Sequence, residues 1–431
     1  MVSWHATKEL KMLILYNILH LIGVLLLFPL LCIYCAAKAK YRRHLPKRLG
    51  LGLNVPPSWT GHAKKTLWIH ALSVGEVTSA LPLLIGLRQR LGDVSIVFSA
   101  STSTGVRLAQ KLASPHCDRV VAFPVDLLPV CSYFLRRIRP DLFILVETDF
   151  WPNFLEQLHR RNIPAVLVNG RISQSSQNLY RRYSFFFKPM FSTFALVCAQ
   201  SEADRGKFLD LGVERGRVFT LGNLKYEAVT SSANDTAKRL TGATSGFVFI
   251  AGSTHADEEL LLFRVFTQLK KRYAIRMVIA PRDISRCRQL QDLAQSRGLT
   301  VQLRSADRPF SEDIYLVDSL GELAAFYACG DICFVGGSLV ACGGHNPLEP
   351  ASLNKPVLFG PDMSDFEEIS AALLACQGAY QVSTVDDFIS VADELISNPH
   401  LRNRCGEAAG NCVRLHQGIV DKHIDLIEDL I

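Results

Sequence analysis

Residues 67–100 read LWIHALSVGEVTSALPLLIGLRQRLGDVSIVFSA, and this pattern decides the fold. A short apolar run at 67–71 leads into a turn at 72–76, and a second apolar run follows at 94–99. Between the two runs, apolar residues recur at helical spacing, at Val77, Leu81, Leu84 and Leu91. The order strand, helix, strand predicts one unit of a parallel sheet with helical crossovers.

The same alternation continues along the chain and predicts two similar halves. Further strands are expected at 119–122, 142–147, 165–168 and 196–199, and then at 247–250, 276–280, 314–317, 332–335 and 356–359. A polar stretch at 230–246 is predicted to be a linker. We therefore expect an α/β protein with two Rossmann-like, doubly wound domains, 49–229 and 247–431, that face a cleft. Ligands of such sheets bind outside the carboxyl ends of the strands.

The composition excludes several classes of protein. Of the 431 residues, 48% are hydrophobic and 20% are charged, which excludes a largely disordered chain. The net charge of +7 is local, because nine Lys or Arg and no acidic residue lie between Glu9 and Glu76, which leaves −2 for the remainder. We therefore expect no nucleic-acid partner. The twelve cysteines show neither zinc-site nor disulfide spacing, as in a reducing compartment.

Residues 12–37 contain no Asp, Glu, Lys or Arg and are long enough to span a bilayer as a helix. A basic segment, 38–48, follows, and the positive-inside rule then places the body of the protein in the cytoplasm. We interpret 1–48 as a signal anchor with a basic collar that suits anionic membrane lipids. A cleaved signal peptide is an alternative, but the apolar run exceeds the usual 7–15 residues. A monotopic insertion also remains open.

In the first half, the turn after the first strand carries Ser73 and Glu76. A carboxylate at such a helix start can accept a proton from an attacking hydroxyl, or it can merely complement the helix dipole. The motif STSTG, near 101–105, places hydroxyls and a glycine at another helix start, which suits an anion or a polyol, or plain N-capping. Thr102, Thr104 and Arg107 are the candidate contacts there.

Glu147 and Asp149 follow a further strand and would form an acidic wall with Glu76. No histidine accompanies these carboxylates, so we expect no metal ion. Two further polar strand ends are NGRIS at 169–173 and GNLKYE at 222–227. Lysines and arginines at such positions are commonly solvated surface charges.

In the second half, the motifs AGSTH, APRD and SLGEL, at 251–255, 280–283 and 319–323, each follow a predicted strand. Arg282 suits a phosphate group. The densest motif, GGSLVACGGHNPLEP at 336–350, combines four glycines with a helix start near Pro347. It predicts a nucleotide cradle in which the helix N-terminus faces phosphate and Glu349 accepts hydrogen bonds from ribose hydroxyls. Ser253 and His345 are further candidate substrate contacts.

Several common motifs are missing from the sequence. No GxGxxG follows the first strand, no GxxxxGK[ST] is present and no GxSxG occurs. These absences argue against a dinucleotide dehydrogenase, a P-loop ATPase and an α/β-hydrolase.

Taken in order, WIHALSVGEV, STSTG, ETDFWPN, NGRIS, GNLKYE, AGSTH, APR, SLGEL and GGSLVACGGHNPLEP resemble the bacterial 3-deoxy-D-manno-octulosonic acid (Kdo) transferases over roughly residues 10–420. The resemblance implies a GT-B fold and a metal-independent, inverting transfer of Kdo from CMP-Kdo to a lipid A precursor. It also implies a location at the cytoplasmic face of a bacterial inner membrane. No cofactor is implied beyond the donor substrate.

The resemblance also implies roles for individual residues. Glu76 matches the general base, and Glu147 and Lys225 match positions that steady the transition state. The residues that match the CMP contacts are Pro281, Arg282, Leu320, Gly321, Glu322, Asn346, Pro347, Leu348 and Glu349. The sequence departs from the family pattern at Asp283, where histidine is usual, in ETDFWPN and NGRIS, and at Asp365-Phe366, where NF is usual.

Two alternatives stay open at this point. One is another sugar-nucleotide enzyme with two Rossmann-like domains, such as a UDP-sugar transferase or an epimerase. The other is a non-catalytic membrane scaffold that binds nucleotide or lipid.

Overall fold

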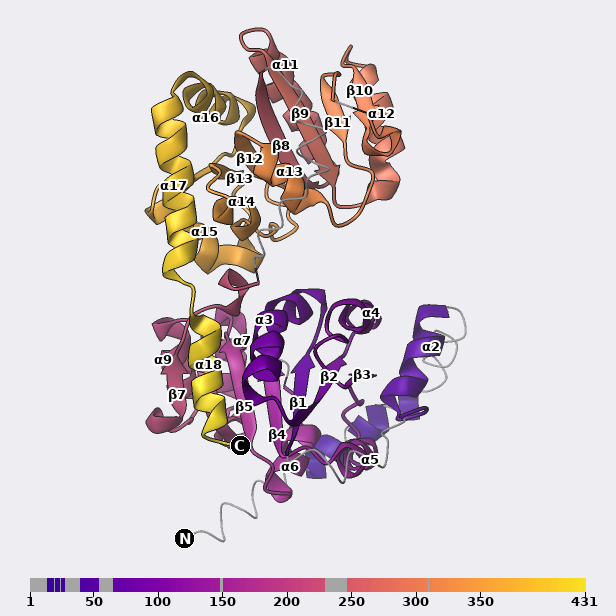
Figure 1. The fold of residues 1–431 in the computed structure, drawn as a ribbon. Coiled ribbons are helices and arrows are strands. Elements are labelled where there is room, and N and C mark those ends of the chain that lie inside the picture. Colours follow the sequence, from indigo (N-terminus) through magenta and orange to yellow (C-terminus); the bar gives the residue numbers. More distant parts are fainter. Residues whose placement is uncertain are drawn as a thin grey trace. The chain divides into compact units, whose positions relative to one another are not determined.

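The computed structural model describes residues 14–18, 20–23, 25–27, 39–53, 65–147, 150–228, 246–308 and 310–431. The chain divides into two compact units (Figure 1). The first comprises Met1–Ala228 together with Gly418–Ile431, and the second comprises Val229–Gln417. The expected linker, 230–246, lies outside the described residues apart from Gly246.

In the described residues, the first unit has a seven-stranded sheet in the order β3-β2-β1-β4-β5-β6-β7, with every pair of neighbours parallel. The strands are β1 (Lys65–Ala71), β2 (Val94–Ala100), β3 (Arg119–Ala122), β4 (Leu142–Val146), β5 (Ala165–Gly170), β6 (Phe194–Ala199) and β7 (Val218–Thr220). The helices are α2 (Ala39–Arg48), α3 (Val74–Leu91), α4 (Ser103–Leu112), α5 (Leu128–Ile138), α6 (Pro152–Arg160), α7 (Gln174–Arg182), α8 (Ser184–Ser192), α9 (Glu202–Asp210) and α18 (Ile419–Glu428), with the 3₁₀ turns η2 (Arg215–Arg217) and η3 (Leu224–Tyr226).

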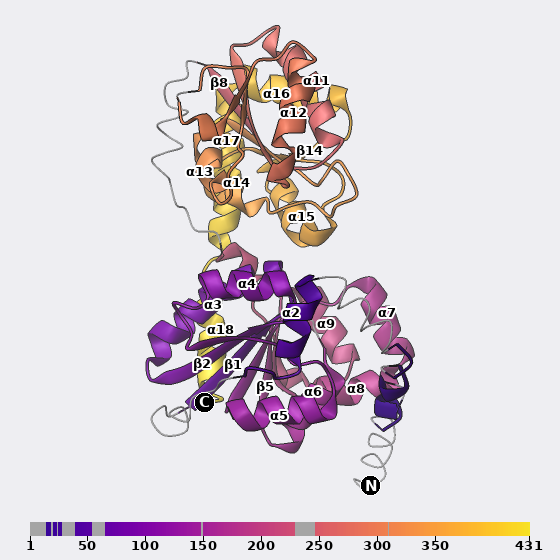
Figure 2. The ribbon, with the colours of Figure 1, turned by 90° about the vertical axis from the view of Figure 1, so that its right-hand side faces the viewer.

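The strands of this sheet are apolar runs rather than alternating patterns because helices cover both faces. Every residue of β2 and of β5 is buried. Helices α3, α4 and α18 pack together on one face, and α5, α6 and α8 pack together on the other (Figure 2). The first sheet is therefore the doubly wound α/β sheet that the alternation predicted.

In the described residues, the second unit has a seven-stranded parallel sheet in the order β10-β11-β9-β8-β12-β13-β14. The strands are β8 (Phe247–Thr254), β9 (Ile275–Pro281), β10 (Val301–Leu303), β11 (Ile314–Leu316), β12 (Ile332–Val335), β13 (Val357–Phe359) and β14 (Ala379–Gln381). The helices are α11 (Glu258–Lys270), α12 (Cys287–Gln295), α13 (Leu323–Cys329), α14 (Leu348–Ser352), α15 (Glu367–Ala375), α16 (Val385–Ser397) and α17 (Pro399–Leu415), with the 3₁₀ turns η4 (Ile284–Arg286), η5 (Arg304–Ala306) and η6 (Ser364–Phe366).

Successive residues of β8 enter different cores in the second unit. Phe249 belongs to a cluster with residues of α11, α12 and α16, whereas Val248 and Ile250 belong to a cluster with residues of α13. Since side chains alternate across a strand, these helices cover opposite faces of the sheet.

The C-terminal helix differs from our expectation, because α18 belongs to the first unit and not to the domain 247–431. The buried face of α18 packs on α3, and Val420 and Ile424 lie so close to Gly86 that a Cβ there would approach them within 3.0 Å and 2.7 Å. Arg90 of α3 also pairs with Asp425, at 2.5 Å, and with a second carboxylate of α18.

The expected anchor, 12–37, lies partly outside the described residues. Its described pieces, within 14–27, are helical and carry exposed apolar side chains. Tyr16 donates a hydrogen bond to Asp126 at 3.0 Å, and Asn17 donates to Asn153 at 2.8 Å. Among the described residues, no helix is both long and apolar enough to cross a bilayer.

Candidate functional site

The switch point of the first sheet lies between β1 and β4, which are neighbours although β2 and β3 intervene in sequence. In doubly wound sheets, ligands bind beyond the carboxyl ends of the strands at such a point. Strand β1 leads into α3, which carries Glu76 in its first turn, and β4 ends directly before Glu147. Asp149, the third member of the expected acidic wall, lies outside the described residues.

Glu76 is held by Ser73, the residue that precedes α3. The backbone N–H of Ser73 donates to Glu76 Oε2 at 3.0 Å, and the Ser73 hydroxyl donates to the same oxygen. Both residues are only partly buried. A Cβ on Gly75 would meet no atom within 4 Å, so the packing of the described residues does not require glycine between them.

Glu147 lies within electrostatic reach of Glu76 and Lys225. Its backbone has a φ of +61°, a conformation that a residue with a side chain rarely adopts and that is frequent at functional sites. Burial raises the pKa of this carboxyl above its ordinary value, and Glu76 adds to the increase. The pKa of Glu147 is lowered by three other groups, which are Lys225, Arg171 and the side-chain amide of Asn169.

Lys225 lies in η3, which is separated from the end of β7 by three residues. Asn223 begins η3 and accepts the backbone N–H of Lys225 at 3.0 Å. The structure thus brings together Glu76, Glu147 and Lys225 from segments separated by up to about 150 residues.

The hydroxyl-rich motif before α4 has a structural role. Thr102 is the N-cap of α4, and its hydroxyl accepts the backbone N–H of Gly105 at 3.0 Å. Thr104 and Arg107 are exposed on α4. In the part of the chain that the structure describes, no hydrogen bond or ion pair links Arg107 to Glu76.

In the second unit, the loops after β8, β9 and β12 meet at the corresponding switch point, because β8 lies between β9 and β12. The backbone N–H of Arg282 donates to Thr254 O at 2.9 Å, and Gly336 N–H donates to Gly252 O at 2.8 Å. Ser253 has a φ of +55°. Glycine is needed at position 336, where a Cβ would approach the Ser253 carbonyl within 2.5 Å.

His345 and His255 form a pair next to Arg282. Their Nε2 atoms are 2.8 Å apart and their rings are nearly parallel, at 16°. Burial lowers the pKa of His345 to about 4, and electrostatic interactions with Arg282 and His255 contribute to the decrease. One imidazole of the pair therefore acts as acceptor and the other as donor near neutral pH.

The segment 346–349 starts α14, which has only five residues. The side chain of Asn346 accepts the backbone N–H of Leu348 at 3.1 Å, with Pro347 between them. Burial raises the pKa of Glu349, whereas the Asn346 side chain and Arg282 act to lower it. Asn346, Glu349, Arg282 and His345 are thus brought into one neighbourhood with Pro281, which ends β9.

The other predicted donor contacts, Leu320, Gly321 and Glu322, form the turn before α13. Leu320 is 77% exposed and Gly321 has a φ of +86°. Glu322 accepts hydrogen bonds from the Ser319 hydroxyl and, at 3.2 Å, from Arg304. In the described residues, these contacts tie Glu322 to Arg304 and not to Arg282.

The sequence reasoning missed Glu258, a buried carboxylate at the start of α11 that organises the glycine-rich segment. Its Oε2 accepts the N–H groups of His255 and Gly337, both at 2.8 Å, and its Oε1 accepts those of Ser338, at 3.0 Å, and Leu339, at 2.9 Å. The signal was a glutamate three residues after His255 at a helix start, which resembles a capping box.

Glu259, also buried and also missed, accepts two hydrogen bonds from Arg286, at 2.8 Å and 3.2 Å, and one from Thr254. Asp283, where the family commonly has histidine, caps η4 by accepting Ser285 N–H at 3.0 Å. The residue that departs from the pattern therefore has a local structural role.

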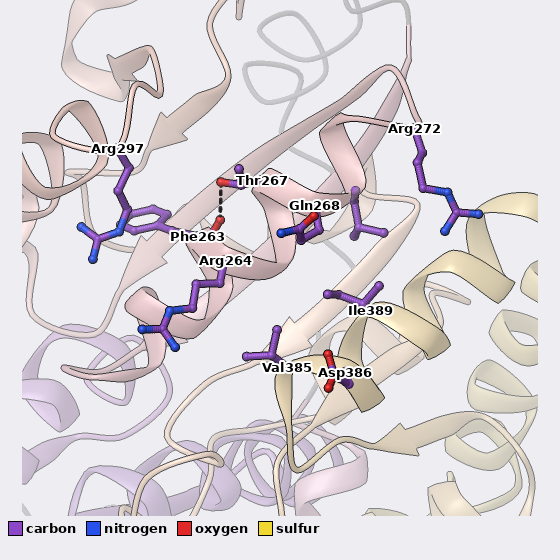
Figure 3. Close-up of a pocket in the computed structure, with 10 residues that line it drawn as sticks. Phe263, Arg264, Thr267, Gln268, Arg272, Arg297, Val385, Asp386 and Ile389 are labelled. Atoms are coloured by element: carbon purple, nitrogen blue, oxygen red, sulfur yellow. Dashed lines mark hydrogen bonds between the residues drawn. The ribbon is translucent and has the colours of Figure 1, made fainter.

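A separate pocket of 680 Å³ lies between α11 and α16 (Figure 3). Arg264, Arg272 and Arg297 line it together with apolar side chains. None of the predicted site residues lines this pocket. Among the described residues, no group of three His, Cys, Asp or Glu side chains is arranged to hold a metal ion.

Comparison with known proteins agrees with the motifs. The family model for 3-deoxy-D-manno-octulosonic-acid transferase (kdotransferase) matches residues 43–228. The 3-deoxy-D-manno-octulosonic acid transferase of Haemophilus influenzae is 32% identical over 90% of this chain and 92% of its own length.

Solved structures resemble the fold. UDP-GlcNAc 2-epimerase from Neisseria meningitidis has a TM-score of 0.58 at 16% identity, over 83% of this chain and 100% of that one. A glycosyltransferase from Rickettsia africae has a TM-score of 0.55 at 12% identity, over 85% and 98%. These likenesses show a GT-B-like fold, and the level and extent of identity to the Haemophilus protein show that the chain belongs to the 3-deoxy-D-manno-octulosonic acid (Kdo) transferase family.

Proposed function

We propose that this Kdo transferase uses CMP-Kdo as donor and a sugar hydroxyl of a lipid A precursor as acceptor, with inversion at the anomeric carbon. The observation that carries the proposal is the cluster of Glu76, Glu147 and Lys225 at the switch point of the first sheet. The cluster places a base for the acceptor hydroxyl beside a carboxyl and an ammonium group that can stabilise charges developing in an inverting glycosyl transfer.

Glu76 takes the proton of the acceptor hydroxyl as the oxygen attacks the anomeric carbon of Kdo. The bond from that carbon to the phosphate oxygen breaks, and CMP leaves with the electron pair. The two hydrogen bonds from Ser73 keep Glu76 Oε2 in place during this step. The carboxylate of Glu147 and the ammonium group of Lys225 stabilise the charges that develop on the sugar and its substituents.

The second unit binds the donor in this proposal. Arg282 and the N–H groups of the glycine-rich segment suit the phosphate, and Glu349 suits the ribose hydroxyls. The uncharged state of His345 near neutral pH leaves Arg282 as the permanent positive charge of this neighbourhood. The exposed turn at Leu320 and Gly321 supports a contact with the cytosine or ribose.

We place the protein at the cytoplasmic face of the bacterial inner membrane. Exposed apolar side chains of the described helical pieces support this placement; they include Leu21, Leu25, Leu26 and Leu27. The basic segment 38–48 suits anionic lipids of the same leaflet. Within it, Arg48 also donates to the carbonyl oxygen of Phe123, at 3.0 Å, so this charge has a structural contact as well.

A donor panel tests the proposal. Purified full-length protein is incubated with a defined lipid A precursor and either CMP-Kdo or a UDP-sugar, and the products are weighed by mass spectrometry. We expect addition of Kdo from CMP-Kdo and no product from UDP-sugars. Activity with UDP-sugars alone would instead favour the sugar-nucleotide enzyme that the likeness to the epimerase fold suggests, and CMP binding without any product would favour a scaffold.

A further inference from the structure

Four consecutive strand ends of the first sheet are joined by hydrogen bonds of three buried side chains, those of Asn169, Gln200 and Asn223. Asn169 Nδ2, at the end of β5, donates to Glu147 Oε1, after β4, at 3.2 Å. Gln200, after β6, donates to the backbone oxygen of Asn169 at 3.0 Å. Asn223, after β7, donates to the side-chain oxygen of Gln200, also at 3.0 Å. These strands are neighbours in the sheet, so the chain runs along its carboxyl edge.

Asn169 contributes to both ends of the candidate site. Its Oδ1 accepts the backbone N–H of Leu224 at 2.9 Å, and Leu224 directly precedes Lys225. One fully buried amide therefore contacts the Glu147 carboxylate with its nitrogen and the loop of Lys225 with its oxygen. Asn223 supports the same loop by accepting Lys225 N–H.

The backbone at Asn169 is shaped for this contact. The pairing of β5 with β6 shifts register between Leu167 and Gly170, and Asn169 has a φ of +55°. A β-bulge beside a site re-aims a side chain. Asparagine tolerates a positive φ better than most residues, and it carries both the donor and the acceptor that the two neighbours need.

We propose that Asn169 is a positioning residue that holds Glu147 as a carboxylate beside Lys225 and fixes the Lys225 loop in the same geometry. This inference rests on the proposed function, because it concerns the residues that steady the transition state. The groups that face Glu147 are Lys225 from η3, Glu76 from α3 and Arg171 from the segment after β5. The amide of Asn169 lowers the pKa of Glu147, as Lys225 and Arg171 do, whereas Glu76 raises it.

Two substitutions separate positioning from folding. Asn169→Gly keeps the positive φ but removes both hydrogen bonds. Asn169→Asp keeps an acceptor for Leu224 N–H but places a second carboxylate against Glu147. The matched control is Asn162→Gly, because Asn162 precedes the same strand and has nearly the same φ, +56°. Both substitutions replace asparagine by glycine, so they change the conformational entropy of the unfolded chain to the same extent.

The measured quantities are the pH dependence of kcat and the direct titration of Glu147 by carbon-13 NMR of labelled carboxyl groups, assigned with Glu147→Gln. A hydrogen bond to a charged group stabilises it enough to shift its titration by about one pH unit. We expect the acid limb of kcat and the Glu147 titration to move up by about one pH unit in Asn169→Gly and further in Asn169→Asp. The KM for CMP-Kdo should change much less than kcat, and Asn162→Gly should match the wild type.

An unchanged Glu147 titration in both Asn169 variants would overturn the inference, as would an equal shift in Asn162→Gly. The titration needs no turnover, so its result stands even if the wild type fails to transfer Kdo. That failure would reject the proposed function by itself. A wild type that transfers Kdo, with Asn169 variants of unchanged pH profile, would reject the positioning role alone.

Discussion

The carboxylate of Glu76 accepts hydrogen bonds from both the backbone N–H and the hydroxyl of Ser73. From the sequence, a first-turn glutamate that complements the helix dipole and a general base are alternative interpretations. The geometry makes them compatible, because the capping contacts engage Oε2 and fix the side chain at the carboxyl end of β1. A base that is already oriented loses little conformational entropy when the acceptor binds.

Arg282→Ala should weaken CMP binding about tenfold to a hundredfold, because a charge-assisted contact to phosphate is lost. Isothermal titration calorimetry of the full chain with CMP measures this without the lipid acceptor. The control is Arg264→Ala, which removes an exposed arginine from the pocket of Figure 3 and should leave CMP affinity unchanged. Equal affinities for Arg282→Ala and the wild type would remove Arg282 from the donor site.

Glu258→Gln should lower both the melting temperature and the affinity for CMP. The variant loses the charge that four N–H groups share, and its amide NH₂ opposes two of those donors. We expect a loss of about 2–4 kcal/mol in the free energy of unfolding. Differential scanning calorimetry measures the decrease in melting temperature, and the control is Glu407→Gln, which alters an exposed glutamate. A variant as stable as the wild type would show that the glycine-rich segment does not depend on Glu258.

We expect His423 to make the stability of the first unit sensitive to acid. Its Nδ1 lies 2.8 Å from Ile419 O, its Nε2 has no hydrogen-bond partner among the described residues, and burial lowers its pKa to about 4. Between pH 6.5 and 4 the unfolded chain binds more protons than the folded one, so stability falls as the pH decreases through this window.

His423→Leu should remove that part of the pH dependence, which amounts to about 3 kcal/mol at pH 4. Thermal unfolding at pH 7 and pH 4.5 measures the change, with the exposed His400→Leu as control. If both variants lose stability on acidification as steeply as the wild type, His423 is not the cause.

Most of the strands that the sequence predicted are buried and lie inside the two sheets, although β3 lies at an edge and β11 and β13 have only three residues each. All of the expected strands are present, with ends that differ by a few residues, as for 196–199 against Phe194–Ala199. The structure adds β7, β10 and β14, which have three residues each and lie at edges of the two sheets. Such short edge strands bury little apolar surface, so their sequences carry no clear periodicity.

The residues of the candidate site also differ in how much of their placement could be predicted from the sequence. Glu76, Glu147 and Arg282 each follow an apolar strand, so their positions at a sheet edge could be predicted locally. The contacts of Glu258 with the glycine-rich segment and of Asn169 with the Lys225 loop could not, because these partners lie about 80 and 55 residues away in sequence. Likewise, α18 packs on α3 across more than 300 residues, which local periodicity does not encode.

The most direct test of the account compares Glu76→Gln with the wild type in Kdo transfer. Purified full-length protein, CMP-Kdo and a defined lipid A precursor are mixed, and mass spectrometry follows the lipid product over time. The control is Glu202→Gln, which alters the first-turn glutamate of α9 in the same unit. We predict that wild type and Glu202→Gln add Kdo and that Glu76→Gln is at least about a hundredfold slower with its fold intact. Transfer by Glu76→Gln at a near wild-type rate would contradict the central claim.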